Sequence, residues 1–296
     1  MIRRESIFER GAMLTPALTG MGRLKQNMLV RTGDQLHSVV AATHSGMPLN
    51  FAADSFSVNA AMNVTDSMGV TGLGYGSEIH ITTANGPILD ISADNVVVEN
   101  IRFVYDPALV SQTLITRPVR CSGATYSPTA LGTGTTTAAI KVTGDNVTIR
   151  NCWFDGFDNA IYSTGSNTQV KCSYFTGGTN SSLAGVYLAG TYGHVAGCYM
   201  DELAYGVYAA GDKSSISDNT ILATETGVFV TSDYNRIHGN YVEGHADGFA
   251  LVLTHDSDSN TVTGNVALPE GAKGTHFFTT GKGNMYAANI GEVDLE

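Results

Sequence analysis

The chain has 296 residues, of which 43% are hydrophobic and 15% charged, and its formal net charge is −11. This charge argues against nucleic acid as a partner, because such binding relies on basic side chains that neutralise phosphates. No stretch approaches the roughly 18 uninterrupted apolar residues of a membrane span, and the first 20 residues lack the apolar core of a secretory signal, so we expect neither membrane insertion nor a signal peptide.

Residues 1–33 form a basic head in front of an acidic remainder. Six basic and two acidic side chains give this head a charge of +4, which leaves −15 on residues 34–296. Because the terminal coils of a repeat protein need covering, we expect the head to cap the fold or to attach the chain to a larger assembly. A solvated tail is the alternative.

Apolar residues recur at a nearly constant interval along most of residues 34–296. From Ile149 onward one series advances by 21, 25, 21, 21, 25 and 24 residues, and a second series advances from Ile140 by 21, 25, 21, 21 and 21. The first series is Val98, Ile149, Val170, Val195, Ile216, Ile237, Val262 and Tyr286, and the second is Ile140, Ile161, Val186, Val207, Val228 and Phe249. Their shared period predicts one domain of stacked coils.

Three further columns follow the same period, within segments that alternate apolar and polar residues as β-strands do. An inward apolar column contains Phe103, Phe154, Phe175, Met200, Ile221 and Val242. A polar column, Cys152, Ser173, Cys198, Asn219, Asn240, Asn265 and Asn289, predicts buried amides that hydrogen-bond from coil to coil. A column of small residues, Ala160, Gly185, Gly206, Gly227 and Gly248, predicts a tight corner.

Residues 104–138 interrupt the repeat with an insertion that contains three prolines and several glycines. Long insertions on a rigid scaffold often carry binding function. The alternative is a loop that covers an edge of the fold.

The phrases IRNCWFDGFDNAIYS, ISDNTILATETGVFV and IHGNYVEGHADGFAL resemble the repeats of the pectin-lyase-like superfamily, and residues 62–81 are similar to its first coils. The resemblance covers roughly residues 50–290. It implies an all-β chain: a single-stranded right-handed parallel β-helix with coils of 21–25 residues. That fold hosts lyases, hydrolases, epimerases and phage tailspikes.

The alternation also predicts which side chains point outward. One aromatic column contains Tyr162, Tyr187, Tyr208 and Phe229, and a second contains Trp153, Tyr174, Tyr199 and Tyr241, with Thr220 between the last two. Contiguous exposed apolar patches mark interfaces or ligand sites. We assign the first column to the interface of a homotrimer and the second to the binding of sugar rings. The alternative is that the rings only cover stacked turns.

Carboxylates accompany the second aromatic column in every other coil, as Asp155, Asp201 and Glu243. Parallel strands lie about 4.8 Å apart, so neighbouring carboxylates are roughly 10 Å apart, slightly more than the ~6.5–9.5 Å of inverting glycosidases. We treat them as candidate catalytic residues, with solubility or turn chemistry as the alternative. We expect no cofactor and no metal, and interpret Cys152, Cys172 and Cys198 as buried free thiols.

These features favour a bacteriophage tailspike or fibre protein of the virion, assembled in the host cytoplasm. It would bind host surface polysaccharide, with or without depolymerase activity, and contact other virion proteins through residues 1–33. One alternative is a glycan-degrading enzyme, a glycoside hydrolase before a lyase or epimerase. The other is a virion structural or decoration protein without activity.

Overall fold

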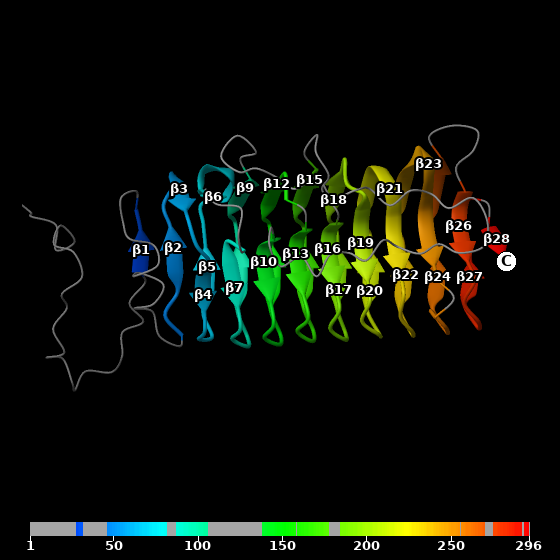
Figure 1. Cartoon of the computed structure of the whole chain (residues 1–296), viewed down its shortest axis with the longest axis horizontal. Helices are drawn as coiled ribbons and strands as arrows, with labels where there is room; N and C mark the ends of the chain where they lie inside the picture. Colours follow the sequence, from blue (N-terminus) through cyan, green and yellow to red (C-terminus); the bar gives the residue numbers. More distant parts are fainter. Residues whose placement is uncertain are drawn as a thin grey trace, which may run out of the picture.

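The computed structural model describes residues 28–31, 46–81, 87–105, 138–157, 159–177, 184–254, 256–269, 275–291 and 293–295. The chain advances through stacked coils along the long axis of the molecule, from its N-terminal to its C-terminal coils (Figure 1). Every pairing between strands is parallel and joins a strand to its counterpart in the next coil. The predicted all-β parallel β-helix is therefore confirmed.

One sheet is built from strands of three residues, one from each coil. In sheet order its strands are β1 (Met28–Val30), β2 (Leu49–Phe51), β5 (Gly69–Thr71), β8 (Val97–Glu99), β11 (Thr148–Arg150), β14 (Gln169–Lys171), β17 (His194–Ala196), β20 (Ser215–Ser217), β22 (Arg236–His238), β24 (Thr261–Thr263) and β27 (Met285–Ala287). We call it sheet A. Strand β1 lies within the predicted head, so the coils begin before residue 34.

The other sheet, sheet B, contains two rows of strands. The first row is β3 (Ser55–Val58), β6 (Glu78–Ile81), β9 (Arg102–Tyr105), β12 (Trp153–Asp155), β15 (Tyr174–Thr176), β18 (Tyr199–Asp201) and β25 (Val266–Pro269). The second row is β4 (Met62–Val64), β7 (Leu89–Ile91), β10 (Ala138–Val142), β13 (Asn159–Ser163), β16 (Ala184–Leu188), β19 (Tyr205–Ala209), β26 (Thr275–Thr279) and β28 (Val293–Leu295). The long strands β21 (Thr220–Val230) and β23 (Tyr241–Leu253) run through both rows.

Two corners flank the short strand of sheet A in the coils from Val98 to Tyr286. The backbone adopts a positive φ three residues before and two residues after each member of the first apolar series. Examples are Asn146 (φ 59°) and Asn151 (φ 51°) on either side of Ile149. Asn and Gly tolerate this left-handed conformation better than other residues. The repeated turn residues therefore set the length of each strand of sheet A.

The predicted insertion falls mostly outside the described residues. Its ends are in strands, since β9 extends to Tyr105 and β10 begins at Ala138, and β9 pairs in register with β12. The insertion therefore lies between the first-row strand β9 and the second-row strand β10, at the place where β12 leads into β13 in the next coil.

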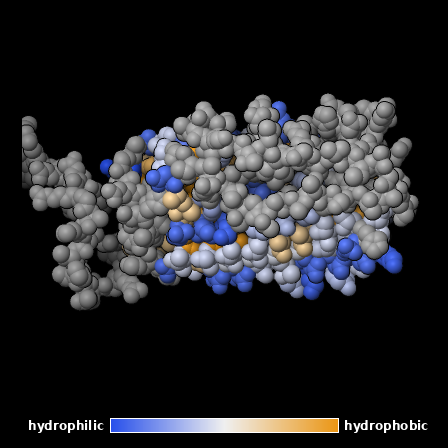
Figure 2. Space-filling view, in the orientation of Figure 1, coloured by the Kyte–Doolittle hydropathy of each residue, from blue (hydrophilic) through white to orange (hydrophobic). Residues whose placement is uncertain are grey.

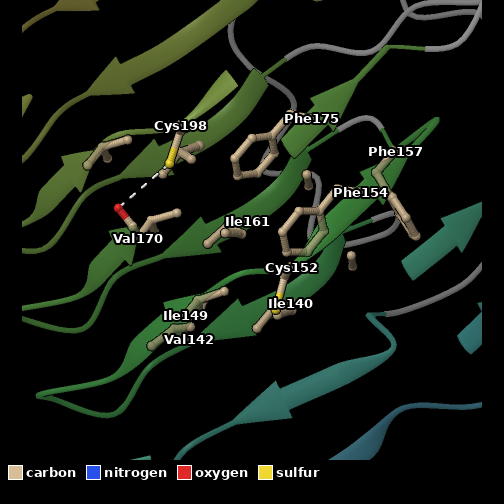
Figure 3. Packing of buried hydrophobic residues seen from close by; sticks show 14 of the residues in the cluster. Ile140, Val142, Ile149, Cys152, Phe154, Phe157, Ile161, Val170, Phe175 and Cys198 are labelled. Atoms are coloured by element: carbon tan, nitrogen blue, oxygen red, sulfur yellow. Dashed lines mark hydrogen bonds between the residues drawn. The ribbon is translucent and has the colours of Figure 1, made fainter. Parts of the chain in front are cut away.

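The inward apolar columns form one continuous core. Phe154 stacks on Phe103 at a centroid distance of 5.2 Å and on Phe175 at 4.8 Å, with ring planes 9° apart in both pairs. Figure 3 shows the rings of Phe154 and Phe175 packed beside Ile140, Ile161 and the thiols of Cys152 and Cys198. Such stacked pairs contribute about 0.5–1.5 kcal/mol each beyond burial of their area.

The second apolar series was predicted wrongly at its last position. It was predicted to end at Phe249, but Val228 pairs with Leu251, whereas Phe249 pairs with Thr226. The column of small residues shifts with it, so the position opposite Gly227 is Ala250 and not Gly248. The cause is an irregular register between β21 and β23, where β23 has extra residues between its two rows.

The cysteines also depart in part from the prediction. Cys152 and Cys198 are buried, but Cys172 is exposed because it occupies a corner position with φ 49°. It precedes the polar column by one residue, and Ser173 fills that column instead. Burial raises the pKa of the Cys152 and Cys198 thiols to about 12, so both are poor nucleophiles and poor metal ligands.

The predicted asparagine ladder is confirmed. The Asn240 amide accepts hydrogen bonds from the backbone N–H and side chain of Asn219, and donates to Ile216 O and Asn265 Oδ1. The ladder continues from Asn265 to Asn289 in the same way. Buried amides are thus satisfied by the coils on either side.

A second ladder, which we did not predict, lies at the other corner of sheet A. Backbone N–H groups of Ser214, Asn235 and Asn260 donate to the side chains of Asn235, Asn260 and Asn284, at 2.7–2.8 Å. These asparagines lie two residues before the anchors Ile237, Val262 and Tyr286, at the same period as the predicted ladder. The signal was therefore present in the sequence.

We predict that Asn240→Ala lowers the free energy of unfolding by about 2–3 kcal/mol, because it leaves buried donors and acceptors of two neighbouring coils without partners. Urea unfolding at neutral pH measures this loss. The matched control is Asn63→Ala, since Asn63 is exposed on β4 and its loss should change stability by less than about 0.5 kcal/mol. Equal losses in the two variants would contradict the ladder's role.

Candidate functional site

Two outward columns run side by side on the first row of sheet B. Strands β12, β15 and β18 share one burial pattern, in which a buried middle residue is flanked by two half-buried outward ones. The column that we call the aromatic column consists, in register, of Arg102, Trp153, Tyr174, Tyr199, Thr220 and Tyr241. The column beside it, the carboxylate column, contains Asp155, Thr176, Asp201 and Leu222 in register, with Glu243 on β23. The structure thus brings the predicted sugar-binding and catalytic residues onto one face.

The tyrosines of the aromatic column stack on each other. The rings of Tyr174 and Tyr199 lie 4.8 Å apart with their planes within 2°. Each ring therefore covers one face of the other, and the pair presents edges and hydroxyls where we had expected open faces for sugar stacking. The second face of Tyr199 is directed along the column toward the coil of Thr220.

A charged network occupies the N-terminal end of this face. Arg102 Nε donates to Asp155 Oδ2 at 2.7 Å, and Arg102 contacts Glu78 Oε1 through its Nη1 at 2.6 Å. Glu78 Oε2 contacts His80 Nε2 at 3.0 Å, and Thr176 Oγ1 donates to Asp155 Oδ1 at 2.8 Å. The network links four successive coils, and its charged groups are only 21–26% exposed.

Tyr75 joins this network to the aromatic column. The Arg102 guanidinium lies 4.2 Å from the centre of the Tyr75 ring, and that ring makes an edge contact with Trp153 at 5.8 Å. Tyr75 lies on the short 3₁₀ helix η1 (Gly74–Gly76) and is 53% exposed. An exposed aromatic ring and a cation therefore stand beside Trp153.

We did not predict Tyr75, Glu78, His80 or Arg102 as part of this face. A signal existed for Arg102, because Phe103 was already placed in the inward column with Phe154, and the residue before each of them is outward. The other three depend on coils whose spacing differs from that of the later repeat.

Burial and these contacts shift the pKa values of several groups on this face. Burial raises the pKa of Glu78, but hydrogen bonds from His80 and Arg102 outweigh it, so the pKa is lowered. Burial lowers the pKa of Arg102, but hydrogen bonds to Asp155 and Glu78 outweigh this and raise it. Burial raises the pKa of Tyr174, with smaller contributions from Tyr199 and nearby carboxylates.

The three candidate catalytic carboxylates have different surroundings. Asp155 is held by Arg102 and Thr176. Glu243 accepts a hydrogen bond from the Tyr241 hydroxyl at 3.3 Å. Within the described part of the chain, no residue forms a hydrogen bond or ion pair with the Asp201 carboxylate. Asp201 and Glu243 therefore have fewer hydrogen-bonding partners among the described residues than Asp155 has.

The column assigned to an oligomer interface is continuous but only half accessible. The rings of Tyr162, Tyr187, Tyr208 and Phe229 follow one another at 4.9–5.0 Å. Tyr162 and Tyr187 are half-buried, whereas Tyr208 is 7% exposed and Phe229 fully buried. The expectation that all four are exposed is wrong for the last two, because both pack in a separate apolar cluster with Ala184, Ala204, Tyr205 and Val252.

The described surface offers little else with obvious chemistry. Its visible face is mostly hydrophilic or intermediate in hydropathy, with a few small hydrophobic areas (Figure 2). The described residues contain no group of three His, Cys, Asp or Glu side chains placed to hold a metal ion. Likewise, no helix within the described ranges is long and apolar enough to cross a membrane.

Comparison with known proteins identifies the family. The model of the right-handed beta helix region matches residues 136–289, just over half of the chain, so the chain belongs to that family. No curated protein matches the sequence.

Solved structures share the fold at low sequence identity. ORF18 of Geobacillus virus E2 is 11% identical with a TM-score of 0.55, and the alignment covers 87% of this chain and 58% of that one. The alginate lyase from Paenibacillus sp. str. FPU-7 is 10% identical with a TM-score of 0.54, covering 88% and 96%. The Agl-KA catalytic domain is 11% identical with a TM-score of 0.57, covering 91% and 56%. The chain thus spans less than two thirds of the viral and Agl-KA chains.

We predict that Glu78→Gln lowers stability at neutral pH by about 0.5–1 kcal/mol, since it weakens a partly exposed ion pair. Because the folded-state pKa of Glu78 lies below its ordinary value of 4.5, this contribution is present above pH 4.5 and is lost as the pH falls through the folded pKa. Unfolding free energies measured from pH 7 to pH 3 should therefore converge for parent and variant. A difference that stays constant down to pH 3 would contradict the network. Glu202→Gln, at an exposed glutamate without an ion pair among the described residues, is the control.

Proposed function

We propose that this chain is a bacteriophage attachment protein that binds host surface polysaccharide along the first row of sheet B. The observation that carries the proposal is the pairing of the aromatic column with the carboxylate column over three successive coils, β12, β15 and β18. Trp153 and the tyrosines supply apolar surface and hydroxyls, while Asp155, Thr176 and Asp201 supply hydrogen-bonding groups. Ligand sites combine apolar surface with a few placed polar groups in this way.

The solved structures agree with such a role without deciding it. One neighbour is a viral protein and another is a lyase that acts on alginate, a polysaccharide. At 10–11% identity these neighbours share the fold alone, and one fold serves many functions. The proposal therefore rests on the residues of the face.

The rest of the attachment model consists of two further proposals. Residues 1–33, with their charge of +4, attach the chain to other virion proteins. Three copies of the chain associate through the outward face around Tyr162 and Tyr187, which remain half-buried and thus partly accessible.

A second candidate function is glycoside hydrolysis, favoured by the outward carboxylates Asp201 and Glu243. In an inverting mechanism one carboxylic acid protonates the leaving oxygen while the other carboxylate activates water. Asp155 is less suited to donate a proton, because Arg102 and Thr176 already hold both of its oxygens.

We predict that the protein binds polysaccharide from its host on a glycan array and that Trp153→Ala weakens binding about tenfold or more, which corresponds to roughly 1.4 kcal/mol. Tyr192→Ala is the matched control, because Tyr192 is 55% exposed but lies at a corner of sheet A. Equal effects of the two substitutions, or no binding by the parent, would contradict the proposal.

Reducing-sugar release that is lost in Asp201→Asn would favour the hydrolase, and binding without release would favour adhesion alone.

We also predict that light scattering gives the mass of three chains and that the double variant Tyr162→Ala, Tyr187→Ala shifts it to one chain. Loss of buried aromatic surface at the interface is the physical reason. Trp153→Ala should remain trimeric. A parent protein with the mass of one chain would overturn the trimer.

A further inference from the structure

The aromatic column contains one gap. Tyr199, Thr220 and Tyr241 are consecutive in register, so a small side chain stands between two large ones. On the N-terminal side of the gap, Tyr199 is already stacked on Tyr174. Its open face is therefore directed at the gap.

The size of the gap suits a single ring. Tyr199 and Tyr241 are two coils apart, which corresponds to about 10 Å at the spacing of parallel strands. A ring between them needs van der Waals contact at about 3.5–4.0 Å on each side, or roughly 7–8 Å in all. One planar or chair-shaped ring fits in that space, and a second does not.

A β-bulge or similar irregularity in the pairing of β21 with β23 follows the gap along the strands. Ile221 pairs with Val242 and Thr224 with Gly244, so β21 has one residue more than β23 over this stretch. Bulges bend a strand and redirect its side chains, and they occur often beside functional sites. This irregularity follows directly after Thr220 and is independent of the ring geometry.

Carboxylates stand on both sides of the gap. Asp201 follows Tyr199 by two residues on β18, and Glu243 follows Tyr241 by two residues on β23. The Tyr241 hydroxyl donates a hydrogen bond to Glu243 Oε2. Leu222 lies between them, level with Thr220. Two carboxylates accept hydrogen bonds from sugar hydroxyls but repel a sugar acid, and the net charge of −11 acts in the same direction.

We propose that the Tyr199–Thr220–Tyr241 gap is a subsite for one uncharged sugar ring, which lies between the two tyrosines and hydrogen-bonds through its hydroxyls to Asp201 and Glu243. The proposal rests on the proposed function, since it names the class of glycan that this face takes. It assigns neutral polysaccharide as the ligand and excludes uronic acids from this position.

The proposal is tested by placing a larger side chain in the gap. In Thr220→Tyr the new ring occupies the space between Tyr199 and Tyr241 and continues the existing stack, whereas Thr220→Ser leaves the gap open. Binding is measured on an array that carries neutral hexose hexasaccharides and uronate hexasaccharides. We expect the parent and Thr220→Ser to prefer the neutral glycans, and Thr220→Tyr to lose at least tenfold in affinity. Thr261→Tyr, which adds the same ring to sheet A, should bind as the parent does.

The outcomes separate the subsite from the proposed function. If Trp153→Ala weakens binding while Thr220→Tyr does not, the face binds glycan but the subsite is wrong. If the parent prefers uronate glycans, the assignment of an uncharged sugar is wrong. If the parent binds none of the glycans, the proposed function and the subsite both fail. Circular dichroism of Thr220→Tyr shows whether the variant is folded. The double variant Tyr199→Ala, Tyr241→Ala provides a second test that does not depend on it: a loss of at least tenfold in affinity for the neutral glycans supports the subsite, and the affinity of the parent contradicts it.

Discussion

The structure depends on one constraint, the in-register parallel pairing of each coil with the next. Because the strands of neighbouring coils lie about 4.8 Å apart, every side chain meets its counterpart one period away. A residue type is therefore selected less for its own position than for its column. Phe154 between Phe103 and Phe175 illustrates the result in the core, where three rings stack with nearly parallel planes.

The same constraint decides how polar groups are handled. At the corners of sheet A, the backbone turns through positive φ values and exposes N–H groups toward the next coil. Asparagines at two positions in the later coils accept these N–H groups and donate to neighbouring carbonyls or to the next amide. On the outside, a charged side chain finds its partners in the coils above and below, as Arg102 does with Glu78 and Asp155. Alternating charges thereby offset the cost of burying each one partly.

The sequence predicted most of this from periodicity alone. Columns of single residues at 21–25-residue steps were enough to place Trp153, Tyr174 and Tyr199 on one outward face and to predict the ladder through Asn219 and Asn240. Where the period changes, the prediction failed, as at Phe249, because extra residues in β23 displace the register by two positions. Burial of Phe229 was also out of reach, since alternation separates the two faces of a strand but does not reveal what packs on the outer one. Cys172 shows the same limit, because one position separates a buried column from an exposed corner.

An outward column becomes a functional face when it combines rings, hydroxyls and carboxylates that are not all in contact with one another. The charged groups around Arg102 and the apolar side chains around Phe229 have their partners within the chain. At Thr220, by contrast, no large side chain stands between Tyr199 and Tyr241. The most direct measurement is a crystal structure of the protein soaked with a neutral oligosaccharide. We expect sugar density on the first row of sheet B, between β12 and β23, with one ring between Tyr199 and Tyr241. Density confined to sheet A or to the ends of the coil stack would contradict it.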